Sequence, residues 1–238
     1  GTLLQKNMVF MDCLQNGVPV KYFMDGEERS ALVYLIDYHD PASNDFTIVN
    51  QWTVVENSEK RLDVVLFVNG LPLVVMELKS PSREETDASA AYRQLRNYMH
   101  EVPSLFVYNA VCVMSDLTVS KAGTITSSED RFMEWKTRDG SYENTAYAQF
   151  DTFFEGIFEK TRFLDILRNF ICFNVDGQNT FKVLAGYHQY FAVKKAVAST
   201  QHATDGKGGV FWHTQGSGKS LSMVFYAHYL QQALESPT

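Results

Sequence analysis

Two apolar runs around the dipeptide Asn69-Gly70 constrain this fold more than any other part of the sequence. The runs are LDVVLFV at 62–68 and LVVMELK at 73–79. Asn-Gly is typical of a tight hairpin turn, because both central positions of such a turn adopt a positive φ. The sequence therefore predicts two antiparallel strands, the second of which is apolar until it reaches Glu77 and Lys79.

The segments around this hairpin alternate between strand and helix patterns. We expect strands at 46–55 and 105–114, where β-branched and aromatic residues gather, and a helix from its N-cap Thr86 to His100. This order predicts a mixed sheet with helices packed on it. The remaining segments are a weak pattern at 1–30, a short apolar run at 31–38, and a polar stretch at 115–148 with a loop expected at 121–129.

The last third of the sequence changes character. Apolar residues recur at helical spacing over 153–171, and a second helix is expected at about 182–198. A Gly-rich stretch then precedes the apolar residues 210–212, which we expect to form a short buried strand, and a helix is predicted to start at Lys219. We therefore expect an α/β chain with a domain at 1–150 and a second unit at 151–238.

Composition limits what the chain can bind and where it works. Its 21 Lys and Arg against 28 Asp and Glu give a net charge of −7, so bulk positive charge cannot hold DNA. Cys13, Cys112 and Cys172 lie far apart and form no C-x-x-C pair, which favours a reducing, cytoplasmic setting over a disulfide scaffold. No apolar run reaches the roughly 18 residues of a membrane span. The N-terminus lacks a signal-peptide pattern, and both ends suggest a piece of a longer protein.

Asp63, Glu77 and Lys79 are the first group of residues that could carry chemistry. Residues two apart on a strand share a face, so Glu77 and Lys79 project together. Two carboxylates on one face repel each other unless a cation lies between them, and Mg²⁺ prefers oxygen ligands. Lys79 could then orient an attacking water. The alternative is a solvated strand end that carries a surface ion pair.

The turn decides whether Asp63 joins this group. A two-residue Asn69-Gly70 loop pairs Val68 with Leu71 and puts Asp63 on the wrong face from Glu77. A three-residue or bulged turn puts Asp63 on the same face as Glu77. A metal site therefore predicts a bulged or three-residue turn, against the simplest interpretation of Asn-Gly.

The segment HTQGSGKS, at 213–220, has the pattern of a phosphate-binding loop. Its glycines let backbone N–H groups face an anion, its lysine reaches terminal phosphates, and its last hydroxyl can bind Mg²⁺. His213 stands where the usual pattern has a glycine. The alternative is a Gly-rich turn that caps a helix. The residues expected to hold the nucleotide are Thr214, Gly216, Ser217, Gly218, Lys219 and Ser220.

Other charged residues give weaker signals. The histidines at 188, 202, 213 and 228 share no zinc-ligand spacing, so we expect surface or loop positions for them. A basic set could touch DNA phosphates or form a solvated face of mixed charge; its members are Arg61, Lys79, Arg83, Arg93 and Arg96.

The run RLDVVLFVNGLPLVVMELKSP and the later AYRQLRNY resemble the motor (R) subunit of type I restriction enzymes. The stretches SKAGTITSSEDRFMEWKT, LDILRNFICF and KVLAGYHQYFAVKKAV also resemble this family, so the resemblance covers most of residues 40–222. It implies a PD-(D/E)xK endonuclease core at Asp63, Glu77 and Lys79. Leu62 stands where the family has a proline.

The same resemblance implies roles for three further residues. Gln94 and Tyr98 match an accessory Q-x-x-x-Y motif on the helix after the nuclease strand, and the alternative is that they are ordinary polar residues on the helix surface. Gln189, in YHQYF, matches an adenine-sensing glutamine, and its alternative is a solvated helix residue.

The function implied is the nuclease and ATP-binding part of a type I restriction subunit. A restriction-endonuclease-like mixed sheet would be followed by the start of a RecA-like, helicase-like motor domain. Mg²⁺ and ATP are the implied cofactors, and double-stranded DNA and the methyltransferase and specificity subunits are the implied partners. We expect the chain alone not to translocate DNA and to hydrolyse ATP poorly. Two alternatives remain: a motor whose nuclease-like domain only binds DNA, and a docking module with structural carboxylates.

Overall fold

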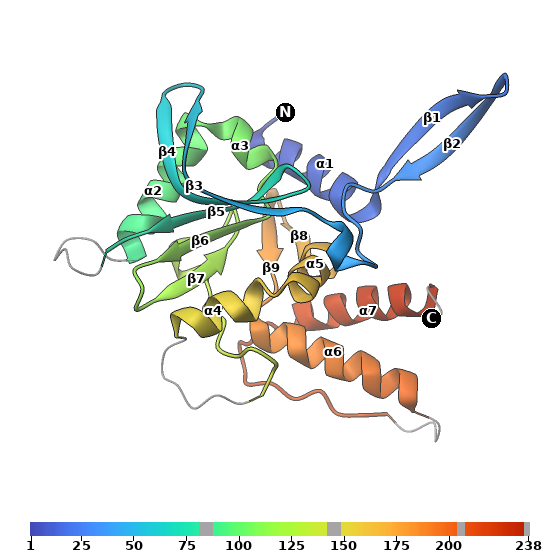
Figure 1. Cartoon of the computed structure of the whole chain (residues 1–238). Helices are drawn as coiled ribbons and strands as arrows, with labels where there is room; N and C mark the ends of the chain where they lie inside the picture. Colours follow the sequence, from blue (N-terminus) through green and yellow to red (C-terminus); the bar gives the residue numbers. More distant parts are fainter. Residues whose placement is uncertain (81–87, 142–148, 204–207, 236–238) are drawn as a thin grey trace.

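The computed structural model describes residues 1–80, 88–141, 149–203 and 208–235. A five-stranded sheet in the order β3-β4-β5-β6-β7 forms its centre, and only the pair β5–β6 is parallel. The predicted mixed sheet with flanking helices is therefore confirmed (Figure 1). The five strands are β3 (Phe46–Val55), β4 (Glu59–Val68), β5 (Leu71–Leu78), β6 (Val111–Ser115) and β7 (Ser120–Gly123).

Helices and two separate hairpins surround this sheet. The helices are α1 (Leu3–Asn16), α2 (Ala88–Glu101), α3 (Pro103–Val107), α4 (Phe150–Ile157), α5 (Lys160–Asn169), α6 (Tyr187–His202) and α7 (Lys219–Glu235). The hairpins pair β1 (Val18–Met24) with β2 (Glu27–Val33), and β8 (Ile171–Asp176) with β9 (Asn179–Leu184). The first hairpin projects away from the body of the molecule (Figure 1).

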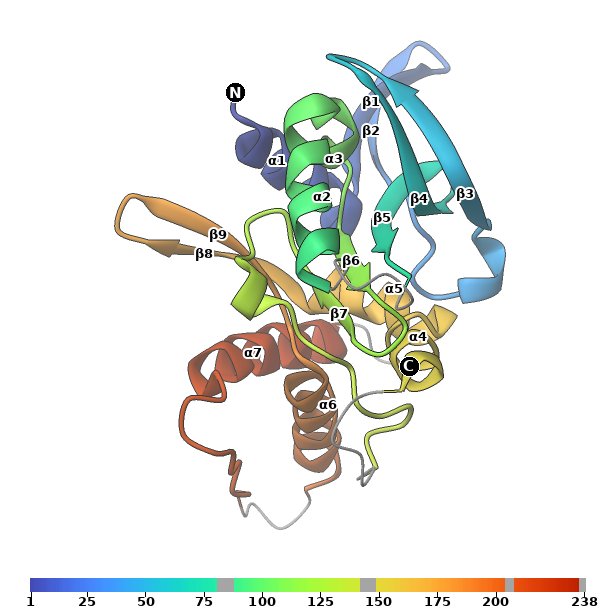
Figure 2. The same ribbon diagram turned by 90° about the vertical axis from the view of Figure 1, so that its left-hand side faces the viewer.

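One face of the sheet packs against α2, as Figure 2 shows with this helix in front of the strands. We call this packing the α2-side core. Ala91, Leu95 and Tyr98 point from the helix onto Val65 and Val75 of the sheet. Their spacing of three and four residues places them on one side of the helix, which explains why α2 lies flat on the sheet. Tyr98 is thereby fixed beside the end of β5.

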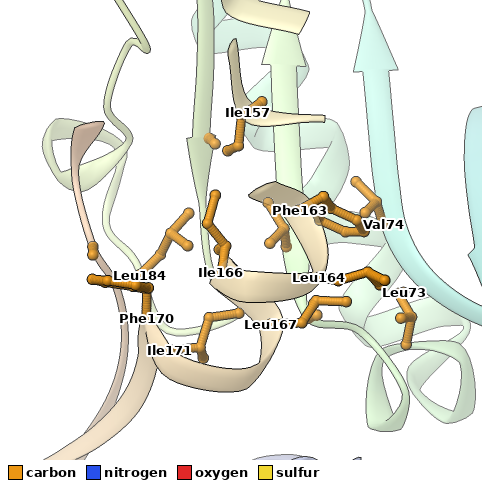
Figure 3. Close-up of a cluster of buried hydrophobic side chains, with 14 of the residues drawn as sticks. Leu73, Val74, Ile157, Phe163, Leu164, Ile166, Leu167, Phe170, Ile171 and Leu184 are labelled. Carbon is orange, nitrogen blue, oxygen red and sulfur yellow. The ribbon is translucent and has the colours of Figure 1, made fainter. Parts of the chain in front are cut away.

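On the opposite face, residues of the sheet share one buried cluster with residues of α1, α4, α5, α6 and α7, and we call this cluster the α5-side core. Figure 3 shows Phe163, Leu164 and Leu167 of α5 beside Leu73 and Val74 of β5. Residues from Phe10 to Phe225 belong to this one cluster. The two halves of the chain therefore share a continuous hydrophobic core, and this core fixes β5 between two layers of helices.

Several predicted elements differ from the observed ones. The strand expected at 105–114 is divided, because Pro103 starts the short helix α3 and only Val111–Ser115 forms a strand. The helix expected at 153–171 is two helices, and the Glu159 side chain caps the second by accepting from the N–H groups of Thr161 and Arg162. Part of the loop expected at 121–129 is the strand β7.

The start of the helix expected at 182–198 is also wrong. Residues 179–184 form β9, whose hairpin turn has Gly177 at φ +60°, and α6 begins only at Tyr187. The strand expected at 210–212 is absent, since Val210 is 94% exposed and Trp212 is 78% exposed. A strand needs a hydrogen-bonded neighbour, and no described segment pairs with these residues. The helix predicted from Lys219 is confirmed.

The weak pattern at 1–30 contains α1 and the first hairpin. A capping box between Thr2 and Gln5 starts α1. The helix expected from Thr86 is described from Ala88 onward, so its predicted N-cap Thr86 lies outside the described residues, as does Arg83. None of the described helices is long and apolar enough to cross a membrane.

Candidate active site

The turn between β4 and β5 has two residues, as the simplest interpretation of Asn-Gly predicts. Asn69 has φ +52° and Gly70 has φ +78°, and Val68 pairs with Leu71. The register then shifts: Phe67 pairs with Pro72, but Leu66 pairs with Val74. Leu73 is therefore an extra residue, which makes a β-bulge one step beyond the turn.

This bulge changes which residues meet further along the hairpin. Val64 pairs with Met76, so one more step of the same register brings Asp63 opposite Glu77. Neither alternative from the sequence is correct in full, because the turn is short and yet the two carboxylates share a face. The bulge is stable because Leu73 and Val74, although successive, both reach the α5-side core (Figure 3). The N–H of Ala110 also donates to the Leu73 carbonyl at 2.7 Å.

Both carboxylate oxygens of Asp63 accept hydrogen bonds from neighbouring strands. The backbone N–H of Leu78 donates to Oδ2 at 2.9 Å, and Nε2 of Gln51 donates to Oδ1 at 3.2 Å. These bonds fix the plane of the carboxylate while leaving further lone pairs on both oxygens. Gln51 is not among the site residues predicted from the sequence, since nothing in its local pattern marks it as part of a site.

Glu77 is buried, with 3% of the residue exposed. Nζ of Lys79 lies 2.6 Å from its Oε1, and the Tyr98 hydroxyl donates to its Oε2 at 3.1 Å. Burial raises the pKa of Glu77, and the charge of Asp63 raises this pKa further, whereas Lys79 and Tyr98 lower it. The site therefore favours a positive charge beside Glu77, and Lys79 supplies one in this structure.

Tyr98 connects the helix α2 to the two strands of the site. Its hydroxyl lies 3.1 Å from Glu77 Oε2 and 3.2 Å from the Arg61 carbonyl oxygen. Burial raises the pKa of Tyr98, and a hydrogen bond with the Gln94 side chain lowers this pKa. The structure thus brings Gln94 to Tyr98, and Tyr98 to Glu77. The Tyr98 hydroxyl stays neutral near pH 7 and acts as a hydrogen-bond donor.

The donor set at this edge of the sheet suits one divalent cation with oxygen ligands. Asp63 and Glu77 supply two carboxylates, and water would have to complete the coordination. The described residues contain no group of three or more His, Cys, Asp or Glu side chains that could hold a metal. The Lys79 ammonium lies where it can balance charge before a cation binds. Phosphate oxygens are also ligands of such a cation, so they could complete its coordination here.

The basic residues expected around this site divide into two groups. Lys79 is in it, and Arg61 contributes its backbone carbonyl to Tyr98. Arg96 instead donates to the carbonyl oxygen of Ile125, and Arg93 is exposed on α2. The basic set is therefore not gathered at the carboxylates.

The segment 213–220 forms a tight loop before α7. Gly216 has φ +80° and Gly218 has φ +77°, which favours glycine at both positions. Nζ of Lys219 donates to the carbonyl oxygens of His213 at 3.0 Å and Thr214 at 2.9 Å. The loop carbonyls thus hold the Lys219 ammonium group.

The other loop residues support this conformation. The N–H of Ser217 donates to the Thr214 carbonyl at 3.3 Å, and Ser220 is exposed in the first turn of α7. Burial lowers the pKa of His213, and the nearby His188 and Lys219 lower it further. A neutral imidazole here leaves Lys219 as the main cation of the loop.

Gln189 belongs to this loop's surroundings rather than to solvent. It is 4% exposed, so the alternative of a solvated helix residue is wrong. Its Nε2 donates to the Gly218 carbonyl at 3.1 Å, and its Oε1 accepts from the N–H of Gly186 at 2.9 Å. His188 beside it lies 3.2 Å from the Ser217 carbonyl. The start of α6 and the loop are therefore in direct contact.

Comparisons with known proteins match two separate parts of the chain. The family model described as "Type I restriction enzyme R protein N terminus (HSDR_N)" matches residues 2–131, which include the central sheet and α2. A second model, the SWI2/SNF2 ATPase, matches residues 188–238, which include Gln189 and the phosphate loop.

Two curated relatives match nearly the whole chain. The Type I restriction enzyme HindI endonuclease subunit of Haemophilus influenzae is 41% identical over 251 residues, which cover 100% of this chain and 24% of the relative. The Putative type I restriction enzyme MjaIXP endonuclease subunit of Methanocaldococcus jannaschii is 32% identical over 250 residues, which cover 93% of this chain and 23% of the relative.

The chain spans about a quarter of the length of the curated relatives it matches. The first family model covers more than half of the chain and includes Asp63 on β4, Glu77 on β5 and Lys79 directly after β5. The chain therefore belongs to the family of type I restriction enzyme R proteins and corresponds to the N-terminal part of those proteins.

Proposed function

We propose that this chain carries the endonuclease site and the ATP-binding loop of a type I restriction enzyme. The observation that carries the proposal is the bulge at Leu73, which brings Asp63 into line with Glu77 beside Lys79. A hairpin with the same sequence and no bulge would hold the two carboxylates on opposite faces. Such a departure from regular pairing, next to a buried carboxylate, is typical of active sites.

In the proposed reaction, Asp63 and Glu77 would hold Mg²⁺ at the end of β5. The ion would activate water and neutralise charge on the scissile phosphate. With a cation on Glu77, the Lys79 ammonium group would be available to position the attacking water. Tyr98 keeps Glu77 oriented by its hydrogen bond, and Gln94 supports Tyr98. Asp63, Glu77, Gln94 and Tyr98 lie on regular elements and Lys79 directly follows β5, so their geometry precedes substrate binding.

The second site is proposed to bind ATP with Mg²⁺. Phosphate oxygens would replace the carbonyl oxygens of His213 and Thr214 as partners of Lys219, and the Ser220 hydroxyl would contact the metal. The loop backbone from Thr214 through Gly216, Ser217 and Gly218 would surround the phosphates. Gln189 already contacts the loop at Gly218, which supports a role beside the adenine.

The activity of the complete enzyme extends this proposal. The chain would cut double-stranded DNA in a complex with methyltransferase and specificity subunits, while the remaining motor drives helicase-like translocation. Residues 1–150 would form the nuclease unit, and residues 151–238 a linker helix and the start of the motor. The free state of Cys13, Cys112 and Cys172 supports a cytoplasmic location. The chain alone is proposed not to translocate DNA or to sustain ATP turnover.

The test is a Lys79→Ala variant in the assembled complex. We expect DNA cleavage to fall by about a thousandfold, because the ammonium group that orients the water is lost. ATP turnover should stay at the wild-type level, since Lys219 and its loop are unchanged. Both rates are measured on the same preparation, with circular dichroism as a check on folding. Equal loss of both activities with an intact fold would contradict the separation of the two sites.

The ion pair between Lys79 and Glu77 also favours a second function, a docking module in which the carboxylates are structural. This alternative predicts that Asp63→Ala leaves DNA cleavage by the complex unchanged. Our proposal predicts that the same substitution removes cleavage. A motor whose nuclease domain only binds DNA would show no Asp63-dependent binding of Mn²⁺, a substitute for Mg²⁺.

A further inference from the structure

Gln51 has a backbone conformation that its position does not explain. Among the described residues, four that are not glycine have a positive φ. Asp25, Asn69 and Leu117 lie in connections between strands, where such values are common. Gln51, at φ +52°, lies within β3. A side chain larger than glycine is strained in this region, so the surrounding structure must hold it there.

The strained residue lies beside a point where the side chains of β4 stop alternating regularly between the two faces of the sheet. Leu62 and Val65 are three residues apart on β4, yet both belong to the α2-side core. Regular alternation would put them on opposite faces. The pairs Asn50–Val64 and Trp52–Leu62 flank this change, so it falls between Gln51 and the facing Asp63.

The Gln51 side chain makes one contact of chemical interest at this point. Its Nε2 donates to Asp63 Oδ1 at 3.2 Å, while the Leu78 N–H donates to Oδ2 at 2.9 Å. The carboxylate is thus held from both neighbouring strands. An amide is suited to this task, because it donates a hydrogen bond without adding positive charge that would repel a cation.

We propose that Gln51 is a positioning residue for Asp63, and that its left-handed backbone is retained because it aims the amide at that carboxylate. This inference rests on the proposed nuclease function. Residues that hold a metal ligand by a hydrogen bond commonly change metal affinity by about ten- to a hundredfold when removed. Gln51 acts through Asp63 and does not itself touch the reacting atoms.

The experiment separates this role from a purely structural one. Gln51→Gly removes the amide and accepts the positive φ, so the thermal midpoint should stay equal or rise. The Mn²⁺ concentration for half-maximal cleavage by the complete enzyme should rise about tenfold. Gln51→Asn restores an amide and tolerates the same backbone, so it should recover part of the loss. Asn50→Ala, at an exposed neighbouring position, is the matched control and should behave as wild type.

Calorimetric titration of the 238-residue chain with Mn²⁺ provides a readout that does not depend on cleavage. Weaker Mn²⁺ binding by Gln51→Gly, with an unchanged thermal midpoint, supports the inference. If the chain binds Mn²⁺ only when DNA is present, the cleavage titration gives the deciding result. An equal Mn²⁺ requirement in Gln51→Gly and wild type, with Asp63→Ala inactive, overturns the inference and leaves the nuclease proposal standing. Full cleavage by Asp63→Ala overturns both.

Discussion

The carboxylate site, formed by Asp63, Glu77 and Lys79, and the phosphate-binding loop, residues 213–220, are organised in opposite ways. Asp63 and Glu77 are held by hydrogen bonds from β3, β5 and α2, and Glu77 is almost fully buried. Lys219 is exposed, and its ammonium group is held by two carbonyls of its own loop. The first site is therefore built before its ligand arrives. The second has contacts that a phosphate would replace. Substitutions in one site should therefore change ligand binding at that site and leave the other site unchanged.

Among the effects on ligand binding, the largest is expected at the phosphate-binding loop, residues 213–220. Lys219→Ala should weaken ATP binding by about a hundredfold, roughly 3 kcal/mol, because the charged donor for the phosphates is lost. Mn²⁺ binding at Asp63 and Glu77 should not change. Fluorescent ATP-analogue titration measures the first quantity, and calorimetry the second. Lys195→Ala, an exposed lysine on α6, is the control, and ATP affinity in Lys219→Ala equal to the control's would remove the loop from the nucleotide site.

The candidate residues of both proposed sites could be picked out from the sequence because each set depends on local spacing. Glu77 and Lys79 share a face by strand alternation, and the GSGKS segment precedes a helix as expected. The bulge at Leu73 could be predicted only as a requirement of the metal site. Its actual position depends on how Leu73 and Val74 pack on α5, which is tertiary information.

The predictions that were wrong also failed because they depend on tertiary structure. Residues 210–212 have strand composition, but a strand exists only with a partner, and sequence periodicity does not supply one. Gln51 was missed because a positive φ within a strand has no compositional signal for glutamine. Lys182 was placed on a helix, whereas it lies on β9 with its side chain buried.

Lys182 of β9 joins the second half of the chain to the first, which carries the carboxylate site. Its Nζ donates to Asn7 Oδ1 at 3.0 Å and to the Asn109 carbonyl at 2.7 Å. Burial lowers the pKa of Lys182 to about 7, so the unfolded chain binds more protons than the folded one above that pH. Stability should therefore rise with pH, by about 1.4 kcal/mol per unit above pH 7.

Urea unfolding between pH 7 and 8.5 measures this slope. The range stops there because burial raises the pKa of Cys112 to about 12, so its thiol contributes in the opposite direction at higher pH. Lys182→Met removes the titrating group and should flatten the slope. A slope that persists in Lys182→Met would assign it to another group.

The smallest expected effect is at Tyr98. Tyr98→Phe keeps the ring in the α2-side core and removes the hydroxyl that donates to Glu77. We expect a loss of about 1 kcal/mol in unfolding free energy and a further rise in the pKa of Glu77. Mn²⁺ affinity should fall several-fold. Tyr92→Phe is the control, because Tyr92 lies on the same helix as Tyr98 and its hydroxyl donates to the Ser127 carbonyl, away from the carboxylates. Equal Mn²⁺ affinity in the two variants would show that Tyr98 serves packing alone.

The bulge at Leu73 also sets a rule of parity for the chain. In a two-residue hairpin without a bulge, facing residues are separated by an odd number, as Val68 and Leu71 are. Asp63 and Glu77 are fourteen apart, an even number, so one unpaired residue between them is obligatory. Natural insertions or deletions in this hairpin should therefore come in even numbers or be offset by a second bulge, whereas a single-residue change would place one carboxylate on the opposite face of the sheet.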